Sequence, residues 1–251
     1  MKRHLLLQIC IVALFCSCAS HNPGLMSIEC GNIKVTRNEK NGGAEAVRAI
    51  LDKHKAAIDS VKKPVIGTAA NELASYPPES PLMNFAADAL HIMAQRHSSM
   101  PIDIALTNKG GLRSTLPEGT ITFGDIYNIF PFENTLALLT LNGEQLMQLF
   151  AEIAKVGGEA ISGARLTISA DGTLLDATVN NLPVDPSKEY RIATSDYLSQ
   201  GNDKLYTLGK GKDKEIKSDI TIRDLMVQYI AELHSKGKAV NAVIDGRITI
   251  K

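Results

Sequence analysis

The chain has 251 residues, of which 44% are hydrophobic and 22% are charged, a composition that is ordinary for one globular domain or two small ones. Its 27 Lys and Arg residues equal its 27 Asp and Glu residues in number, so it has no basic surplus of the kind that recruits nucleic acid by releasing counterions from phosphates. A nucleic acid polymer is therefore excluded as an expected partner.

Residues 1–17 are predicted to be a secretory signal. Two basic residues precede an apolar stretch, Leu5 to Phe15, which is too short to span a bilayer that needs about 20 apolar residues. The small residues that follow look like a bacterial lipoprotein processing site, in which Cys18 becomes the lipidated first residue. The alternative is a simple secretory signal that is cleaved after Ala19 or Ser20. We expect an exported protein that is lipid-anchored to the bacterial cell envelope, on its periplasmic or outer surface.

Residues 18–27 are predicted to be a polar tether, and residues 28–251 the folded domain. Residues 28–37 alternate loosely and are expected to form a strand. Beyond the Asn41-Gly42-Gly43 break, apolar side chains recur at steps of three, four and seven residues, which predicts an amphipathic helix. These side chains are Val47, Ile50, Leu51, Ile58 and Val61.

Strands and helices are interspersed along the rest of the chain. Strands are predicted over residues 65–70, 102–107, 135–141, 190–195 and 247–250, and helices over 82–97, 124–129, 146–153 and 222–233. The clearest hairpin joins residues 165–169 to 174–180 around Asp171-Gly172. A hairpin without sustained βαβ alternation favours a mixed β-sheet packed with several helices, an α+β domain, over a doubly wound parallel fold.

Several hydrolytic chemistries receive no support from the residues. Ser114 and Ser162 lack the G-x-S-x-G spacing of a nucleophile elbow. Residues 208–213, L-G-K-G-K-D, lack the first glycine and the final Ser or Thr of a phosphate loop, and are predicted to be a solvated loop. The histidines have no metal-ligand spacing, so we expect them to be isolated surface residues and find no visible metal site.

The turn N-K-G-G-L-R at residues 108–113 is the first candidate binding element. Gly110 and Gly111 follow a predicted buried strand, where they would permit positive φ angles and let a ligand approach the main-chain N–H groups. Asn108 offers an amide, and Arg113 offers a planar fork that fits phosphate or carboxylate. The turn is suited to a small anion; the alternative is a tight strand exit with a surface arginine.

Two aromatic residues lie in polar turns elsewhere. Phe132 follows a proline in I-F-P-F-E-N-T, and Tyr197 follows a predicted strand in T-S-D-Y-L-S-Q-G-N-D. Two rings on separate loops can sandwich a flat base, each stack contributing about 1 to 3 kcal/mol. Asp203, six residues after Tyr197, could accept hydrogen bonds from a ribose diol. These residues predict a nucleoside or nucleotide as the ligand.

With N-K-G-G-L-R, F-P-F-E-N-T and D-Y-L-S-Q-G-N-D in that order, the chain resembles the C-terminal domain of the 5'-nucleotidase and UDP-sugar hydrolase family. The resemblance covers residues 65–251 and includes E-S-P-L-M-N-F-A-A-D-A at 79–89 and D-G-R-I-T-I at 245–250. It implies that two rings clamp the base while polar residues position the rest of the substrate. Carried over, the substrate-binding residues are Asn108, Gly110, Gly111, Arg113, Phe132, Tyr197 and Asp203.

The chain departs from the family pattern in three places. Tyr76 occupies a position where the family usually has an arginine, which removes one anion contact. The family turn Gly-Gly-Asp-Gly reads Gly201-Asn202-Asp203-Lys204, which keeps the carboxylate but stiffens the loop. The N-terminal metallophosphatase domain that carries the two metals in the family is missing. We therefore expect no cofactor and no catalytic residue in this chain, and a divalent metal pair only in a separate metallophosphatase subunit.

Two functions are compatible with these residues. The chain is either the nucleotide-binding half of a 5'-nucleotidase-type hydrolase that acts with a separately encoded catalytic partner, or a stand-alone lipoprotein that binds or scavenges nucleosides without hydrolysing them. A fold that persists without a competent pocket is the third alternative, and Tyr76 and Asn202 favour it.

Overall fold

The computed structural model describes residues 43–251, so the predicted signal, Cys18, the tether and the strand expected at 28–37 lie outside the described residues. The chain divides into two compact units, residues 1–49 and 50–251. The described part of the first unit is the beginning of helix α2 (Gly43–Lys62), whose apolar positions 47, 50, 51, 58 and 61 are all exposed. The amphipathic helix predicted there is confirmed, and the second unit is described below by itself.

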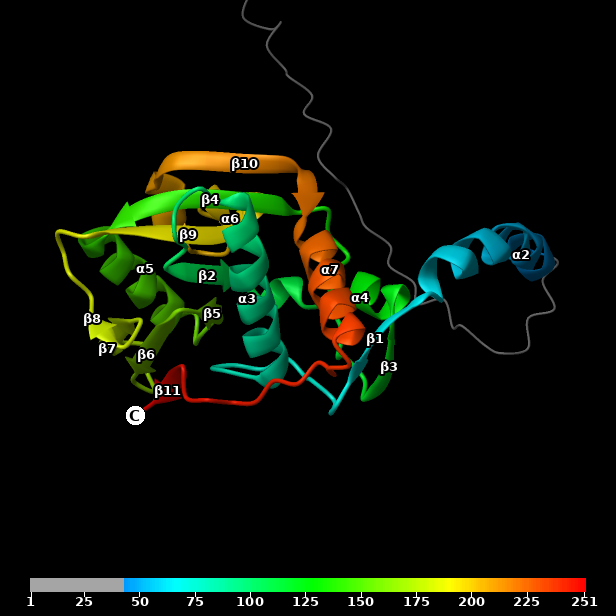
Figure 1. Ribbon diagram of the computed structural model, residues 1–251, viewed down its shortest axis with the longest axis horizontal. Coiled ribbons are helices and arrows are strands. Elements are labelled where there is room, and N and C mark those ends of the chain that lie inside the picture. The colour runs from blue at the N-terminus through cyan, green and yellow to red at the C-terminus, as the bar shows by residue number, and fades with distance from the viewer. Residues whose placement is uncertain (1–42) are drawn as a thin grey trace, which may run out of the picture. The chain divides into compact units, whose positions relative to one another are not determined.

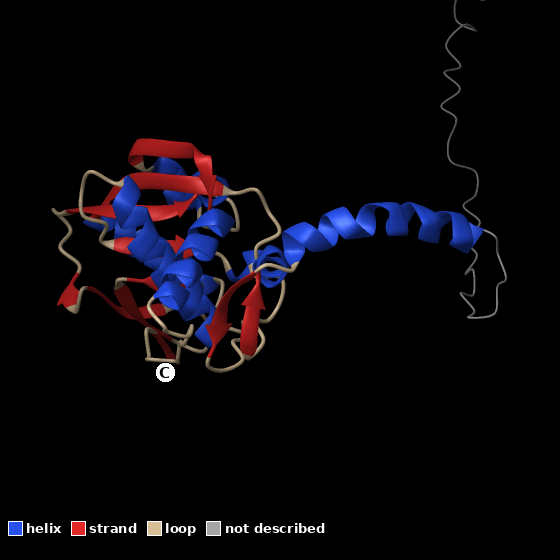
Figure 2. Ribbon diagram, turned by 45° about the vertical axis from the view of Figure 1, so that its right-hand side comes forward, coloured by secondary structure: helices blue, strands red, loops and turns tan. Residues whose placement is uncertain are grey.

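The second unit contains three β-sheets with helices packed among them (Figures 1 and 2). The helices after α2 are α3 (Pro81–Ala94), α4 (Phe123–Ile129), α5 (Gly143–Lys155), α6 (Asp196–Ser199) and α7 (Ile222–Ser235). The α+β class is confirmed, but the strands are divided among separate sheets where we had expected one.

The two-stranded sheet pairs β1 (Val65–Ala69) with β3 (Gly119–Thr122). The five-stranded sheet has the order β10 (Lys212–Thr221), β4 (Thr135–Asn142), β9 (Glu189–Ser195), β2 (Ile104–Thr107), β5 (Ala160–Ser162). The four-stranded sheet has the order β11 (Ile248–Ile250), β6 (Ala164–Ile168), β7 (Leu174–Val179), β8 (Leu182–Pro183). The antiparallel β6–β7 pair confirms the predicted hairpin.

The central strands of the five-stranded sheet, β4, β9 and β2, are buried on both faces. Along β2, Ala105 belongs to a core shared with α3 and α7, whereas Ile104 and Leu106 belong to a second core shared with α5. Successive side chains of a strand point to opposite faces, so a strand covered on both sides is apolar throughout. This explains why the short, mostly apolar stretch at 104–107 forms a strand that is buried throughout.

Polar side chains determine where the helices begin. The Ser80 hydroxyl accepts a hydrogen bond from the N–H of Met83 at 3.3 Å, and Pro81 occupies the first turn of α3, where its missing N–H costs nothing. α4, α5 and α7 each begin with a capping box, in which a Thr or Asn side chain and a side chain three residues later satisfy each other's backbone N–H groups. Each of these four helices therefore has a defined first residue.

The prediction of a solvated loop over residues 208–213 is wrong. A 3₁₀ turn covers Tyr206–Lys210, and Lys212 begins the ten-residue strand β10. The sequence K-D-K-E-I-K-S-D-I-T carries few apolar residues because β10 is an edge strand whose side chains are mostly exposed. Lysines on an exposed edge discourage pairing with other chains. Backbone pairing with β4, rather than side-chain pattern, makes this segment a strand.

His91 also differs from the expectation of isolated surface histidines. It is half-buried on α3, with its Nδ1 3.2 Å from the hydroxyl of Ser162 and its Nε2 3.0 Å from the carbonyl oxygen of Ile102. The imidazole therefore links α3 to β5 and to the segment that leads into β2, a structural role that the spacing of histidines in the sequence does not indicate.

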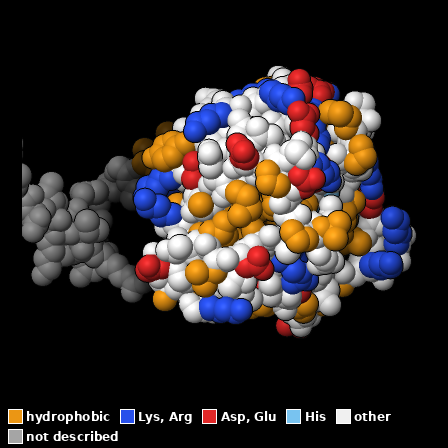
Figure 3. Space-filling view, turned by 90° about the vertical axis from the view of Figure 1, so that its left-hand side faces the viewer, with side chains coloured by type: hydrophobic (Ala, Val, Ile, Leu, Met, Phe, Trp, Pro, Cys, Tyr) orange, Lys and Arg blue, Asp and Glu red, His pale blue; other side chains and the backbone are white. Residues whose placement is uncertain are grey.

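The surface of the second unit shows no single-sign charge field on the face seen in Figure 3. Lys, Arg, Asp and Glu side chains are interspersed there, around hydrophobic side chains near the centre of the face. Within residues 43–251 no helix has the length and hydrophobicity needed to cross a membrane.

Candidate functional site

A cavity of about 370 Å³ is lined by all seven residues that the sequence predicted to bind substrate, together with Asn134. The lining residues are Asn108, Gly110, Gly111, Arg113, Phe132, Asn134, Tyr197 and Asp203. They come from three segments that are far apart in the chain. We call this cavity the three-loop pocket.

Sheet topology brings the three segments together. β2 and β9 are neighbouring parallel strands, so their C-terminal ends reach the same edge of the five-stranded sheet. β4 is antiparallel to β9, so its N-terminal end reaches that edge as well. The chain leaves β2 at Asn108, leaves β9 just before Tyr197, and enters β4 just after Asn134. The pocket therefore lies where the ends of three adjacent central strands meet.

The carboxylate of Asp203 is the polar centre of the pocket. One oxygen accepts a hydrogen bond from the Asn108 amide at 2.6 Å, and the other accepts one from the Tyr197 hydroxyl at 2.8 Å. The hydrogen bond to Asp203 raises the pKa of Tyr197 above its ordinary value. Asp203 has a φ of 55°, a left-handed conformation that Asp tolerates better than most residues. A carboxylate has lone pairs left after two such bonds, so Asp203 can accept further hydrogen bonds from a ligand.

The expectation that Gly110 and Gly111 adopt positive φ is wrong. They lie in a 3₁₀ turn, Lys109–Gly111, whose φ angles are accessible to any residue. A Cβ on Gly111 would lie 2.9 Å from Oδ1 of Asn108, so the side chain of Asn108 requires glycine there. A Cβ on Gly110 would meet only ordinary contacts, so Gly110 leaves the approach to Asp203 open.

Arg113 and Phe132 form the outer part of the pocket. The guanidinium of Arg113 donates to the carbonyl oxygen of Gly110 at 3.2 Å, and its central carbon lies 6.0 Å from the centroid of the Phe132 ring. Phe132 is 49% exposed and Tyr197 is 39% exposed, although both are aromatic. Exposed rings beside a cation, on the rim of a cavity, are available to stack against a planar ligand.

Two polar side chains hold the aromatic loops in place. Arg223, buried at the start of α7, donates to the carbonyl oxygen of Phe130 at 3.0 Å and pairs with Glu133. The Asp196 carboxylate accepts from the N–H groups of Thr135 at 3.0 Å and Tyr197 at 2.8 Å. Asp196 therefore ties the loop that carries Phe132 to the turn that carries Tyr197.

Asn134 was not among the residues predicted to bind substrate, although it stands two residues after Phe132 in F-P-F-E-N-T. Asn134 lines the pocket, and its main-chain oxygen accepts a hydrogen bond from the N–H of Ile222 at 2.8 Å. An amide beside an exposed aromatic ring is the signal that would have identified it, because an amide can both donate to and accept from the edge of a base.

The departures from the family pattern have structural counterparts. Tyr76 is exposed and is not among the residues that line the three-loop pocket. Asn202 donates from its amide to the carbonyl oxygen of Tyr197 at 2.8 Å, an extra hydrogen bond within the loop. Lys204 has a φ of 66°, a conformation that favours glycine.

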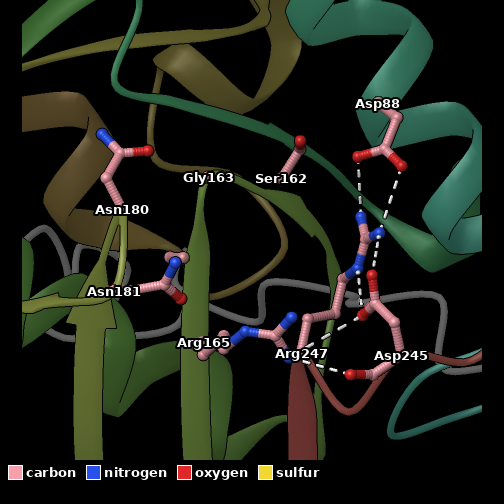
Figure 4. A pocket seen from close by; sticks show the side chains of 9 residues that line it. Asp88, Ser162, Gly163, Arg165, Asn180, Asn181, Asp245 and Arg247 are labelled. Carbon is pink, nitrogen blue, oxygen red and sulfur yellow. Dashed lines mark hydrogen bonds and ion pairs between the residues drawn. The ribbon is translucent and has the colours of Figure 1, made fainter.

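A second cavity, of about 190 Å³, has a different character (Figure 4). At its wall Arg247 lies between Asp88 on α3 and Asp245, with nitrogen–oxygen distances of 2.8 to 3.1 Å to the two carboxylates. Asp245 therefore has a lowered pKa, mainly through its hydrogen bond to Arg247. Figure 4 shows Arg165, Asn180, Asn181 and Ser162 around the remaining space. This cavity lacks an aromatic wall, and its central charges already satisfy one another.

The described residues do not fit the two-metal centre of a metallophosphatase. Between Gly43 and Lys251, no three or more His, Cys, Asp or Glu side chains cluster in a way that could hold a metal ion. The acidic residues of both cavities instead pair with Arg, Asn or Tyr side chains.

The chain belongs to the 5'-nucleotidase C-terminal domain family, whose model matches residues 65–210. It is 30% identical over 166 residues to the endonuclease YhcR of Bacillus subtilis, covering 63% of this chain and 13% of that protein. It is 29% identical over 167 residues to the protein UshA of Yersinia enterocolitica, covering 64% of this chain and 30% of that protein. The chain thus spans less than a third of either relative.

The fold resembles that of a solved 5'-nucleotidase precursor from Thermus thermophilus, with a TM-score of 0.69 and 24% identity. That match covers 82% of this chain and 42% of the other chain. The resemblance to the 5'-nucleotidase C-terminal domain inferred from the sequence is therefore confirmed at the level of family and fold.

Proposed function

We propose that this chain is the nucleoside- or nucleotide-binding half of a 5'-nucleotidase-type phosphoester hydrolase. The observation that carries the proposal is the convergence of two exposed aromatic rings, an arginine and a carboxylate on one cavity at the edge of a buried sheet. Phe132 and Tyr197 would stack on the base, Asp203 would accept from the ribose hydroxyls, and Arg113 would contact an anionic group. The Thermus thermophilus and Yersinia relatives support the family part of this assignment.

In this proposal the catalytic metals belong to a separately encoded metallophosphatase subunit. The described residues supply substrate binding and orientation, and the partner supplies the metal pair that generates the attacking hydroxide. Export and a lipid anchor at Cys18 would place the chain on the cell envelope, where it could meet extracytoplasmic nucleotides. A Cys18→Ala variant should then leave the membrane fraction, and continued membrane association would contradict the anchor.

A stand-alone nucleoside-binding or scavenging lipoprotein is the second candidate, because the rings, arginine and carboxylate that line the three-loop pocket would suffice to bind a nucleoside without hydrolysing it. Two stacks and a few polar contacts, offset by the losses of rotational and translational freedom, correspond to micromolar to millimolar affinity, roughly −8 to −4 kcal/mol. A scavenger would bind nucleosides in that range and would gain no turnover from a partner.

The test measures binding and hydrolysis separately. The full chain, purified in detergent, is titrated with adenosine and AMP by calorimetry, and AMP hydrolysis is assayed with Mn²⁺ or Zn²⁺, alone and with a candidate metallophosphatase. We expect binding by the chain alone and turnover only with the partner. Chelator-sensitive turnover by the chain alone would contradict the division of labour, and a lack of nucleoside binding would contradict both candidates.

A further inference from the structure

Lys109, the second residue of the N-K-G-G turn, does not line the three-loop pocket, although its neighbours Asn108 and Gly110 do. Its ammonium donates to the main-chain oxygens of Val156 at 2.9 Å and Gly158 at 2.7 Å, just beyond the C-terminus of α5. A cation at this end of a helix is favoured by the helix dipole and satisfies carbonyl groups that lack partners within the helix. The side chain of Lys109 therefore anchors the turn to α5.

Glu159 completes the attachment from the other side. One carboxylate oxygen lies 3.1 Å from the Lys109 ammonium, and the other accepts the main-chain N–H of the same residue at 2.5 Å. The carboxylate is only 5% exposed, and it contacts both the backbone and the side chain of Lys109. If either member of such a buried pair is removed or loses its charge, the polar atoms of the other member remain buried without compensation.

Burial and neighbouring charges both act on the pKa of the Glu159 carboxylate. Burial raises the pKa of Glu159, and the hydrogen bonds and charge of Lys109 oppose that rise. The negative charge of Asp203 raises it further. Lys109 on the turn and Asp203 in the pocket are thus the two charged groups that act on Glu159, and the positive charge of Lys109 compensates the repulsion between the two carboxylates.

We propose that the Lys109–Glu159 pair is a positioning device that holds the Asn108–Arg113 turn in the geometry required for nucleoside binding. The inference rests on the proposed function of the three-loop pocket. Because residue 109 is fixed at both its N–H and its side chain, Asn108 before it is kept within reach of Asp203, and Gly110 after it is kept facing the cavity. Neither Lys109 nor Glu159 lines the three-loop pocket.

The test compares Glu159→Gln and Lys109→Met with two controls on exposed positions of α5, Glu144→Gln and Lys155→Met. Adenosine is the probe because it lacks a phosphate, whose second pKa of about 6 would add its own pH dependence. Affinities are measured by calorimetry between pH 5 and pH 8. We expect each pair variant to weaken adenosine binding about tenfold at pH 7, as for loss of a charged hydrogen bond, and each control to leave it unchanged.

The pH profile separates positioning from simple loss of stability. In the natural chain, adenosine affinity should fall as the pH is lowered and Glu159 takes up a proton. Glu159→Gln should show a smaller fall, because residue 159 then has no carboxylate to protonate. Circular dichroism at each pH verifies that the variants are folded under the conditions of the titration.

The outcomes are distinguishable. If the natural chain binds adenosine and both pair variants bind it equally well with the same pH profile, the positioning inference is wrong and the proposed function stands. If the natural chain binds no adenosine between pH 5 and pH 8, the proposed function is wrong and the inference falls with it.

Discussion

The five sequence motifs that resemble the 5'-nucleotidase family lie in two different regions of the molecule. N-K-G-G-L-R, F-P-F-E-N-T and D-Y-L-S-Q-G-N-D meet at the three-loop pocket. E-S-P-L-M-N-F-A-A-D-A and D-G-R-I-T-I meet instead around Arg247, where Asp88 and Asp245 flank its guanidinium (Figure 4). Family motifs therefore occur both in the candidate binding region and in a structural one, and only the arrangement of side chains distinguishes the two.

The two regions differ in what their polar groups contact. Around Arg247, Glu79 accepts hydrogen bonds from the Asn84 amide at 2.6 Å and the N–H of Asp245 at 2.8 Å, so the start of α3 is joined to the C-terminal segment. In the three-loop pocket, the aromatic rings are exposed and Asp203 retains capacity to accept more hydrogen bonds. Mutually satisfied charges indicate a structural role, and exposed rings beside incompletely used polar groups indicate binding.

The largest expected effect comes from Arg247→Met. Removing the guanidinium leaves the carboxylates of Asp88 and Asp245 facing each other at the wall of the second cavity. We expect the free energy of unfolding to fall by about 3 kcal/mol, which is the lower end of the range for breaking a buried ion pair. The lower end applies because the two carboxylates are 41% and 39% exposed. Denaturant unfolding measures the change. Adenosine affinity should be unchanged under conditions where the variant is folded, and weakened binding would mean that the two regions are coupled.

Phe132→Ala should have the opposite effect to Arg247→Met: adenosine affinity should fall, and the stability of the fold should change little. Loss of one stacking surface should weaken adenosine binding by about 1 to 3 kcal/mol, roughly fivefold to 150-fold. The free energy of unfolding should change little, because about half of the Phe132 side chain is already exposed in the folded protein. Calorimetry provides the affinity. Arg165→Gln, at the second cavity, is the matched control and should leave binding intact; equal losses in the two variants would remove the distinction between the regions.

Lys204→Gly tests whether the pocket loop carries backbone strain. Lys204 has a left-handed φ of 66°, a conformation that costs a residue with a Cβ about 1 kcal/mol or more. Replacing it with glycine should therefore raise the free energy of unfolding by about 1 kcal/mol. Thermal and denaturant unfolding of the two proteins, compared side by side, measure the gain. A loss of stability would mean that the side chain of Lys204 contributes more than its backbone costs.

The smallest expected effect is a dependence of stability on acid. The pKa of Asp245 is lowered in the folded protein by Arg247, so its contribution to stability is complete above the unfolded value of about 3.9 and is lost as the pH falls through the lower folded value. Unfolding experiments between pH 6 and pH 3 should show this loss, and Arg247→Met should reduce it. An identical slope in both proteins would assign the acid sensitivity to other carboxylates.

Much of the fold was predictable from the sequence because local patterns determine it. Apolar spacing located α3, α5 and α7, and Asp171-Gly172 located the β6–β7 hairpin. β10 was missed because its side chains are charged and exposed, so that only pairing with β4 makes it a strand. His91 was misplaced because its hydrogen bonds are to residues distant along the chain.

The sequence by itself determined which residues offer the chemistry of the site, since rings, carboxylate and guanidinium are properties of residue type and each lies in a recognisable turn. Tertiary structure alone decided that three of the motifs share one pocket and two share an ion-pair cluster, because that depends on strand order and direction in the sheet. It also decided the role of Lys109, whose partner Glu159 is fifty positions away and adjoins it only because β2 and β5 are paired.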